Sequence, residues 1–332
     1  EVAGFKFVSE GDGSCQYVLK GGSAGRVEGR LTDVLKGATL FAKAYSGGSA
    51  RSQAHALADD VVLEVTGKAG IARTKIAFKV TQGQTSEIYV SDYDGHNAVP
   101  ATQDKSIAAA PTWRPGHRML FYTTYKLGNP DIVSQDLDSQ ARRVVARYSG
   151  SNISPAVSPD GQRVAMILSK GGNLDVYVAN IDGTGLKQVT QTRDDESSPC
   201  WSADGRTICF ATRIDGRRTL AQVSADGGSV RRIATTGVVN PSEPDWSPDG
   251  KYIAFTAQMG GFEICLVKAG GGEVKLLTSG EDPCWAPNSR TLVFTKRGSG
   301  GKRSLSLLDV PTKQSKDVQQ NFGICSQPSW AR

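Results

Sequence analysis

Histidine is scarce in this sequence, which has only His55, His96 and His117 among its 332 residues. Metal centres and nucleophilic triads usually draw on histidine. The surrounding pattern places His55 in a helix and the other two in tight turns, so none is expected at a shared site. The sequence therefore predicts no metal, no cofactor and no histidine-based catalysis.

The six cysteines include no C-x-x-C pair, which argues against a zinc ribbon and against a dithiol redox motif. Their simplest interpretation is as small buried hydrophobic residues. Cys200 and Cys209 flank Asp204-Gly205 symmetrically, so they are expected to lie opposite each other on neighbouring strands. Oxidation of this pair in an exported protein is the open alternative.

Long apolar runs and basic runs are also absent. No apolar stretch approaches the roughly 18 residues that a membrane span requires, so no membrane span is expected. The net charge of +6 comes from lysines and arginines that are interleaved with 33 acidic residues. Because no basic run stands out, nucleic acid is not an expected partner.

What the sequence does contain is a repeat of Pro-x-Trp-Ser-Pro-Asp-Gly-like units. They are 44, 44, 45, 39 and 45 residues apart, close to the roughly 40–45 residues of one four-stranded propeller blade. The predicted fold is therefore mainly β, with a six-bladed β-propeller over residues 71–332. The units begin at Pro111, Pro155, Pro199, Pro244, Pro283 and Pro328.

Residues 1–70 precede the repeat and predict a small α/β domain. Residues 29–34 and 38–45 alternate as two antiparallel strands. A helix follows, with Ser49 as its N-cap and Gly67 at its end. With so few strands, this domain is interpreted as part of a larger α/β unit. The apolar stripe expected to face the sheet is Ala54, Leu57, Ala58, Val61, Val62 and Val65.

The order of the repeat predicts how the ring closes and which loops share a face. The first blade lacks a leading Pro-x-Trp strand, so the C-terminal strand is expected to complete it beside residues 76–78. The Asp-Gly turns then lie on one face as structural turns. The segments before the prolines lie on the other face, called the mouth, around a central channel. Because loops on a rigid scaffold often carry function, the mouth is the candidate site.

The mouth is also expected to be basic. Its hairpin loops carry nine cations, against only Asp131 and Asp215 as acids. Such a rim would steer an acidic protein surface, because charge complementarity acts mainly on the association rate; a solvated rim without a partner is the alternative. The nine cations are Lys126, Lys170, Arg213, Arg217, Arg218, Lys296, Arg297, Lys302 and Arg303.

Several segments together resemble the TolB family of propeller proteins in the Tol-Pal cell-envelope system. They are Thr-Lys-Ile-Ala-Phe at 74–78, Val-Ser-Asp-Tyr-Asp-Gly at 90–95, the proline-led repeat, and the helix from Ala54-His55 to Thr66-Gly67. The resemblance implies a non-enzymatic adaptor in the periplasm that supports outer-membrane integrity and cell division. A monomer without a cofactor is expected.

The resemblance also implies partners and a site. In that family the propeller mouth binds the peptidoglycan-associated lipoprotein, Pal, and an N-terminal arm contacts TolA. The partner-facing His and Glu of the family fall on Ser151 and Ser198. The resemblance therefore implies where the partner binds, but the side chains at these two positions differ from those of the family. The chain matches the second half of the family's N-terminal domain, so the TolA-contacting arm is expected to be missing. The expected partner-binding residues are Ala110, Ser151, Ser154, Ser197, Ser198, Glu243, Asp282 and Gln327.

A propeller enzyme, or the propeller module of a peptidase, is the alternative function. Residues 21–25 match the G-x-S-x-G pattern of serine hydrolases, but they precede a strand and do not form a strand-turn-helix elbow. Peptidase propellers accompany a hydrolase domain, for which this chain has neither the length nor the motifs. An enzyme would need clustered ionisable groups deep in the channel. The sequence places Glu243, Asp245 and Asp282 near the channel mouth, where solvated or cation-paired acids are the simpler interpretation.

Overall fold

The computed structural model describes residues 5, 8, 13, 15–318 and 322–332. The chain forms two compact units, Glu1–Thr74 and Lys75–Arg332, which are described separately below. The mainly β fold expected from the sequence is confirmed. Among the described residues, no helix is both long and apolar enough to cross a bilayer.

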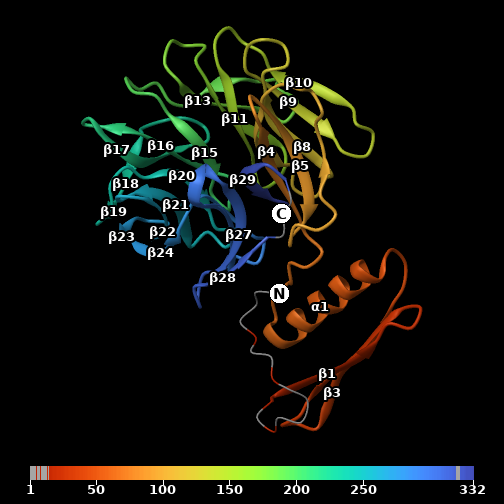
Figure 1. Cartoon of the computed structure of the whole chain (residues 1–332). Coiled ribbons are helices and arrows are strands. Elements are labelled where there is room, and N and C mark those ends of the chain that lie inside the picture. Colours follow the sequence, from red (N-terminus) through yellow and green to blue (C-terminus); the bar gives the residue numbers. More distant parts are fainter. Residues whose placement is uncertain (1–4, 6–7, 9–12, 14, 319–321) are drawn as a thin grey trace. The chain divides into compact units, whose positions relative to one another are not determined.

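The first unit is a three-stranded antiparallel sheet in the order β1-β2-β3, with one helix packed on β2 and β3 (Figure 1). The two strands expected from the sequence are β2 and β3. Strand β1 was missed because its glycines, Gly21 and Gly22, indicated a loop, yet it pairs with β2 from Tyr17 opposite Asp33 onward. The elements are β1 Tyr17–Gly22, β2 Val27–Asp33, β3 Ala38–Tyr45 and α1 Ala50–Thr66.

Helix α1 begins and ends where the sequence predicts. The Ser49 side chain accepts a hydrogen bond from the N–H of Ser52 at 3.2 Å, which satisfies one of the free N–H groups of the first turn. Gly67 ends the helix with a left-handed φ of 67°, a conformation that glycine adopts without steric cost.

The predicted apolar stripe of α1 is confirmed in part, since Val62 is buried and Leu57, Ala58, Val61 and Val65 are half-buried, but polar residues share the buried face. Ala54 is exposed, and the buried residues of the helix are Gln53, Asp59 and Val62. Gln53 is buried because its Oε1 accepts a hydrogen bond from the N–H of Val27 in β2 at 2.7 Å. A contact of this kind depends on where the sheet lies, so hydrophobic periodicity alone could not predict it.

The second unit contains six four-stranded antiparallel sheets, which are the six blades predicted from the repeat (Figure 1). A short parallel pair, β19 with β23, and a 3-10 turn, Ser299–Gly301, lie between or within blades. The first blade contains β29 Ile324–Trp330, β4 Lys75–Gln82, β5 Thr85–Asp92 and β6 Val99–Pro100, and the second contains β7 Ala108–Trp113, β8 Met119–Thr124, β9 Asp131–Asp136 and β10 Arg142–Ala146. The third contains β11 Asn152–Val157, β12 Arg163–Leu168, β13 Asp175–Asn180 and β14 Lys187–Gln188, and the fourth contains β15 Ser197–Trp201, β16 Thr207–Ile214, β17 Arg217–Ser224 and β18 Arg231–Ile233. The fifth contains β20 Ser242–Trp246, β21 Tyr252–Gln258, β22 Phe262–Lys268 and β24 Lys275–Ser279, and the sixth contains β25 Glu281–Trp285, β26 Thr291–Arg297, β27 Arg303–Asp309 and β28 Gln314–Asp317. The short strands are β19 Thr235–Thr236 and β23 Gly272–Glu273.

The C-terminal strand supplies the innermost strand of the first blade. Trp330 of β29 lies opposite Ile76 of β4, and Ser329 lies opposite Ala77. One sheet therefore joins the two ends of the propeller unit, and β29 covers the inner edge that β4 would otherwise leave open.

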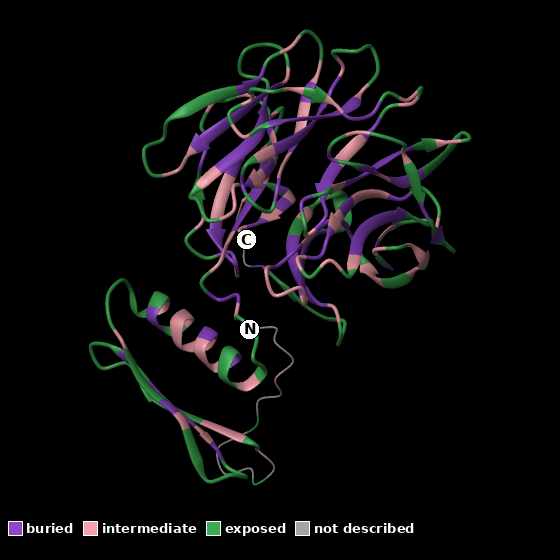
Figure 2. Cartoon of the chain, turned by 180° about the vertical axis from the view of Figure 1, so that it is seen from behind, coloured by how far each residue is buried: buried purple, intermediate pink, exposed green. Residues whose placement is uncertain are grey.

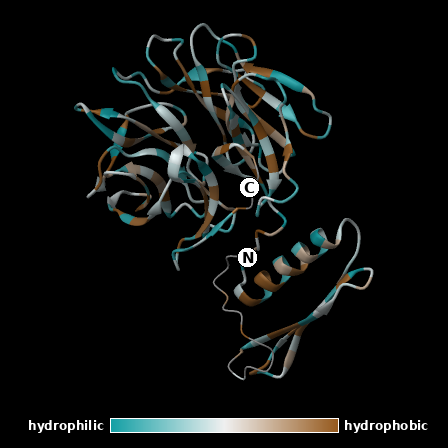
Figure 3. Cartoon of the chain, in the orientation of Figure 1, coloured by the Kyte–Doolittle hydropathy of each residue, from teal (hydrophilic) through white to brown (hydrophobic). Residues whose placement is uncertain are grey.

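The buried and hydrophobic residues concentrate in the inner strands of each blade, and the outermost strands are largely exposed (Figures 2 and 3). Strand β28, for example, is exposed along its whole length, whereas the middle strand β26 is buried over its first five residues. The hydrophobic core therefore lies between blades, where the faces of neighbouring sheets meet.

Indole side chains connect neighbouring blades near the axis. The indole N–H of Trp201 donates a hydrogen bond to the carbonyl of Ala156 in the preceding blade at 2.8 Å. Trp285 makes the equivalent bond to Asp245 at 3.1 Å, as Trp113 does to Ser329 at 3.1 Å. The repeated tryptophan thus fills the space between blades and also satisfies its polar atom there.

The Asp-Gly segments are structural turns, as expected. In the turn after β15, the Ser202 hydroxyl donates to Asp204 Oδ1 at 2.6 Å, and the Arg206 N–H donates to the same oxygen at 3.1 Å. These hydrogen bonds hold the pKa of Asp204 below its usual value, and the one from Ser202 contributes most. Asp160 and Asp249 make the same pair of contacts in their own blades.

Candidate functional site

The residue before each unit proline has a left-handed backbone, and this feature builds the mouth. In each blade it lies at a register shift between the two innermost strands, which is the position of a β-bulge. A non-glycine residue with positive φ costs on the order of 1 kcal/mol, and such bulges turn side chains in a new direction. The six residues are Ala110 (φ 50°), Ser154 (53°), Ser198 (53°), Glu243 (53°), Asp282 (54°) and Gln327 (51°).

A cavity of about 400 Å³ runs along the innermost strands of all six blades. The six left-handed residues line it, and so do turn residues such as Pro159, Ala203 and Pro248 at the other end of the same strands. Six of the eight residues that the sequence proposes for the site therefore share one cavity.

The other two proposed residues, Ser151 and Ser197, lie outside the cavity lining. The N–H of Ser151 donates to the hydroxyl of Ser169 at 2.7 Å. The hydroxyl of Ser197 accepts a hydrogen bond from Arg218 at 3.4 Å. Both serines therefore connect a loop of the mouth to a neighbouring hairpin, which makes them part of the rim.

A hydrogen-bond relay joins the left-handed residues over half of the ring. The side chain of Glu243 accepts a hydrogen bond from the backbone N–H of Asp282 in the next blade at 3.0 Å. Asp282 accepts from the N–H of Gln327, and Gln327 accepts from the N–H of Ala110, each also at 3.0 Å. In this half of the cavity the side chains are thus held in place by the neighbouring backbone.

The other half of the ring has short side chains and is more open. The relay ends at Ala110, whose side chain has no polar atom. The N–H of Ser154 is bound instead by the Thr123 hydroxyl at 3.0 Å. The serine hydroxyls of Ser154 and Ser198 line the cavity without the long side chains found opposite, so this half leaves room for groups of a partner.

Two carboxyl groups of the relay lie close enough to affect each other. Burial, and after it the negative charge of Glu243, raise the pKa of Asp282 to about 7. The hydroxyl of Thr256 donates to Glu243 at 2.6 Å, and that of Thr295 donates to Asp282 at 3.0 Å. Near neutral pH this part of the cavity therefore carries less negative charge than its two carboxyls would have in water.

A second layer of side chains lies one step further along the channel. The carboxylate of Asp245 accepts a hydrogen bond from the N–H of Trp285 at 2.7 Å and forms an ion pair with Arg332. The thiol of Cys284 accepts from the N–H of Trp330 at 3.3 Å. The ionisable groups of this layer are thus occupied by structural partners.

All six cysteines are free thiols in the structure. Cys200 and Cys209 lie directly opposite each other on β15 and β16, as the sequence predicts, and both are buried. Burial, followed by the neighbouring Cys209, raises the pKa of Cys200 well above its usual value. Four of the six cysteines are buried, in agreement with their interpretation as small hydrophobic residues.

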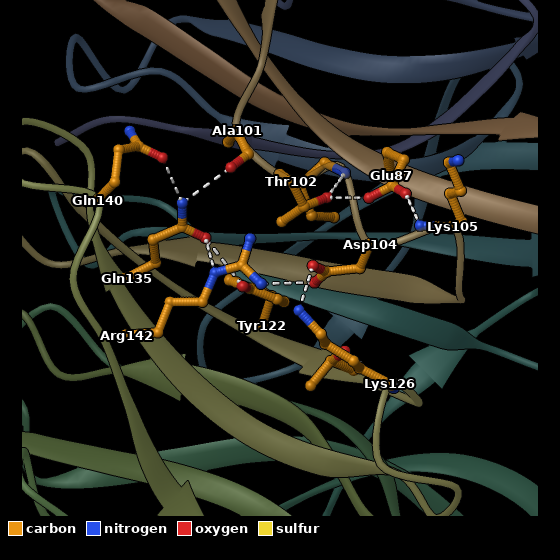
Figure 4. A network of polar contacts seen from close by, with 12 residues as sticks. Glu87, Ala101, Thr102, Asp104, Lys105, Tyr122, Lys126, Gln135, Gln140 and Arg142 are labelled. Carbon is orange, nitrogen blue, oxygen red and sulfur yellow. Dashed lines mark hydrogen bonds and ion pairs between the residues drawn. The ribbon is translucent and has the colours of Figure 1, made fainter.

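A polar network fixes the mouth loop between β6 and β7 (Figure 4). Asp104 accepts hydrogen bonds from Lys126 at 2.8 Å and from Arg142 at 2.5 Å. Burial alone would raise the pKa of Asp104, but these two cations outweigh it and hold the pKa below its usual value. Glu87 fixes the same loop, because it accepts the N–H of Lys105 at 2.7 Å.

This loop presents an apolar cluster that the sequence analysis missed. Ile107 is exposed, and its carbonyl accepts the N–H of Tyr125 at 2.9 Å, which places it beside the exposed Tyr125 and Leu127 of the β8–β9 hairpin. A second exposed pair, Val239 and Met259, lies on a mouth loop and its neighbouring hairpin. The sequence does carry a signal for both clusters. Leu127 and Met259 are apolar residues in hairpin loops, where other blades have Gly or Lys.

The rim is less basic than the sequence predicts. Four of the nine predicted cations form ion pairs: Lys126 with Asp104, Lys296 with Asp317, and both Arg297 and Arg303 with Glu281. Lys170 lies 4.5 Å from the ring centre of Tyr148. The neutralising acids lie outside the hairpin loops that carry the cations, namely Asp104 in the β6–β7 loop, Glu281 in β25 and Asp317 in β28, so counting charges within each loop overestimated the charge.

The part of the chain that the structure describes contains no group of three or more His, Cys, Asp or Glu side chains arranged to hold a metal ion. What the fold and the site together define is a six-bladed β-propeller whose channel opens into a mouth of rigid loops, with a small α/β unit before it. Propellers of this class commonly use such a mouth to bind other molecules.

Comparison with known proteins identifies the family. Residues 62–332 match the family model described as the TolB beta propeller domain, and the chain belongs to this family. "Tol-Pal system protein TolB" of Anaeromyxobacter sp. (strain K) is 34% identical over 165 residues, which cover 48% of this chain and 37% of that protein. The same-named protein of Actinobacillus pleuropneumoniae serotype 5b is 41% identical over 106 residues, or 32% and 25% of the two chains.

The match to these curated relatives thus spans well under two thirds of their length. Among solved structures, TolB from Acinetobacter baumannii superimposes with a TM-score of 0.86 at 23% identity, covering 95% of this chain and 83% of that one. A propeller in a nidogen/laminin complex reaches a TM-score of 0.64 at 12% identity, covering 78% and 98%. At these identities the structural matches establish the fold.

Proposed function

We propose that this chain is a non-enzymatic, monomeric adaptor of the Tol-Pal system in the periplasm, and that its mouth binds the peptidoglycan-associated lipoprotein. In this role it would support outer-membrane integrity and cell division. The first unit would be the second half of a larger N-terminal domain. We assign contact with TolA to an N-terminal arm and give the described residues no role in that contact.

The observation that carries the proposal is the position of the exposed hydrophobic side chains. Nine large hydrophobic residues of the propeller are exposed among those described, and six of them lie at the mouth. Five of the six form two separate groups at the mouth, and grouped exposed apolar side chains on a soluble protein commonly mark a protein interface. The six are Ile107, Tyr125, Leu127, Val239, Met259 and Ile324; the other three, Val99, Val144 and Leu276, lie on outermost strands.

The rigidity of the mouth also supports binding without catalysis. The relay from Glu243 to Ala110 and the network around Asp104 hold loops and side chains in one arrangement before a partner arrives. A preorganised surface loses less conformational entropy on association, so more of its contact energy appears as affinity. This favours tight docking of one partner surface.

The carboxyl pair in the channel is the one feature that favours the enzymatic alternative. A carboxyl with a raised pKa, such as Asp282, is a candidate general acid in an enzyme. Here, however, both carboxyl groups accept backbone N–H groups or threonine hydroxyls as part of the ring. We therefore assign the pair a structural role.

The test is titration calorimetry of this chain with the soluble domain of the peptidoglycan-associated lipoprotein from the same organism. We expect saturable one-to-one binding. The double variant Ser154→Arg with Ser198→Arg should weaken binding at least about tenfold, because two long charged side chains would occupy the open half of the cavity. Absence of binding by the unchanged chain, or full affinity of the double variant, would contradict the proposal.

The control for added charge is Ser229→Arg with Ser315→Arg. Both serines are exposed and lie outside the cavity lining, and neither side chain forms a hydrogen bond with another described residue. This control adds the same charge as the double variant at the mouth. It should bind the lipoprotein domain like the unchanged chain.

A further inference from the structure

The hairpin between β16 and β17 is a rigid arm of the mouth. Both strands are eight residues long and remain paired up to Ile214 opposite Arg217. Only Asp215 and Gly216 connect them, with φ values of 53° and 73°. Positive φ at both positions is typical of the tight type I′ turn, whose twist matches that of the strands. The side chains near this turn are therefore presented by an ordered backbone.

Three arginines lie at the tip of this hairpin, and two of them directly oppose each other. Arg213 of β16 is the cross-strand partner of Arg218 of β17, and Arg217 follows at the turn. All three are exposed. Like charges at directly opposed positions destabilise an antiparallel pair. Fold stability therefore gives no reason for this arrangement.

These arginines have no acidic partner among the described residues. Arg218 donates to the Ser197 hydroxyl at 3.4 Å, which leaves its charge uncompensated. The single acid of the hairpin, Asp215, is in no ion pair with any of them within 4.0 Å. Four other cations of the mouth are instead bound by Asp104, Asp317 or Glu281. Of the nine predicted cations, the five without an ion pair among the described residues are these three arginines, Lys170 and Lys302, so most of the uncompensated charge lies on this hairpin.

The position of the hairpin connects this charge to the rest of the mouth. Arg218 reaches Ser197, the neighbour of the cavity residue Ser198. The exposed pair Val239 and Met259 belongs to the next segment of the ring. A cationic arm beside an apolar patch and an open cavity matches a protein surface in which a hydrophobic centre is bordered by charge.

We infer that the tip of the β16–β17 hairpin docks against a carboxylate-bearing surface of the protein partner. Guanidinium groups match carboxylates in geometry, and a rim charge acts chiefly by steering the encounter. Three arginines on one hairpin are too few for the many phosphate contacts that drive binding to nucleic acid. The inference rests on the proposed function, since it describes the charge of the partner at the same mouth.

The test measures association and dissociation rates with the soluble lipoprotein domain at about 50 mM and about 500 mM salt. The variant is Arg213→Gln with Arg217→Gln, which leaves Arg218 and its contact with Ser197 in place. The matched control is Arg231→Gln with Arg232→Gln on β18, the outermost strand of the same blade, where both arginines are exposed. Both double variants remove two positive charges from one blade.

At low salt we expect the hairpin variant to associate about 3–10-fold more slowly than the unchanged chain, with a smaller change in dissociation. At high salt the difference should fall below about twofold, because added ions screen exposed charges. The control should keep the association rate of the unchanged chain. Equal thermal unfolding midpoints for all three proteins would show that folding is unaffected.

Two results would overturn the inference and leave the proposed function standing. In one, the unchanged chain binds and the hairpin variant associates at the same rate at low salt. In the other, both double variants slow association equally, which would show an effect of net charge alone. Failure of the unchanged chain to bind would overturn the proposed function, and the inference with it.

Discussion

Glu243 and Asp282 occupy equivalent positions in neighbouring blades, and the carboxylate of the first binds the backbone N–H of the second at 3.0 Å. Both residues have left-handed backbones, with φ values of 53° and 54°. The bond therefore satisfies an N–H group that the bulge turns away from the sheet ladder. Asp282 and Gln327 make the same kind of contact to the next blades, and the relay ends at Ala110.

Removing the carboxylate of Glu243 tests the contribution of this relay. We expect Glu243→Ala to lower the free energy of unfolding by about 1–2 kcal/mol, because the N–H of Asp282 keeps only the Thr256 hydroxyl at 3.1 Å. Glu243→Gln should cost less, since its amide oxygen can still accept that N–H. Urea unfolding followed by tryptophan fluorescence measures both. Equal stability of the alanine variant and the unchanged chain would show that the relay contributes nothing.

The left-handed backbone of Ser198 gives a second prediction. A β-branched side chain is strained at positive φ, so Ser198→Val should destabilise the propeller by about 1 kcal/mol or more. Ser198→Gly should be tolerated, because glycine adopts this conformation freely. The control is Ser197→Val at the start of β15, where φ is not positive and valine suits a strand. If Ser198→Val and Ser197→Val have the same urea midpoint, the strain assigned to position 198 is wrong.

The repeat made the blades predictable, because each unit carries its own local chemistry. The Trp and the Asp-Gly turn use contacts within one unit or with its neighbour, such as Ser202 with Asp204, so their spacing is visible in the sequence. The caps of α1 at Ser49 and Gly67 are local in the same way. Strand β1 was missed because Gly21 and Gly22 disfavour a strand, and only pairing with β2 reveals it.

The details of the mouth were not predictable for the opposite reason. The relay joins residues that are 39, 45 and 217 positions apart in the chain. The expectation of a basic rim was only partly right, since Glu281 of β25 neutralises both Arg297 and Arg303. Which cation remains unpaired is a property of the ring and not of any single repeat.

Glu196 gives a prediction about pH. It lies in the mouth loop before β15 and is fully buried, where it accepts hydrogen bonds from Thr190 at 2.8 Å and Thr192 at 2.6 Å. Its pKa is raised from 4.5 to about 7, chiefly by burial and also by the nearby Asp175, although the two threonine hydrogen bonds lower it. The folded protein therefore holds this proton at pH values where the unfolded chain has lost it.

The sign of the effect follows from this difference. Between about pH 4.5 and 7 the folded state binds more protons than the unfolded state, so the contribution of Glu196 to stability falls as pH rises through this range. Glu196→Gln removes this dependence. Relative to the unchanged chain, the variant should gain stability on the order of 1–3 kcal/mol between pH 5 and pH 8.

Urea unfolding at a series of pH values measures this difference directly. The control is Glu273→Gln, an exposed acid on β23. Its stability difference from the unchanged chain should not follow the pH curve of Glu196→Gln. If the Glu196→Gln difference is the same at pH 5 and pH 8, the buried carboxyl does not titrate as described.

In the first unit, Asp59 of α1 binds the segment that follows the helix. Its carboxylate accepts the N–H groups of Ala72 at 2.7 Å and Arg73 at 3.2 Å, and the Arg73 guanidinium at 2.9 Å. Asp59 is buried, whereas the neighbouring Asp60, among the described residues, bonds only to the side chains of Lys43 and Tyr45 at 2.8 and 2.7 Å. The two adjacent acids thus offer a matched pair for mutation.

We expect Asp59→Ala to destabilise the first unit by about 2–3 kcal/mol, because it leaves two backbone N–H groups without their acceptor. Asp60→Ala should cost about 1 kcal/mol or less, as for a side-chain contact near the surface. All five tryptophans lie in the propeller unit, and α1 is the α-helix of the described residues. Thermal unfolding followed by far-ultraviolet circular dichroism should therefore show an earlier loss of helix in Asp59→Ala, with the tryptophan fluorescence transition unchanged. If both signals shift together, or if Asp60→Ala has the larger effect, the assigned role of Asp59 is wrong.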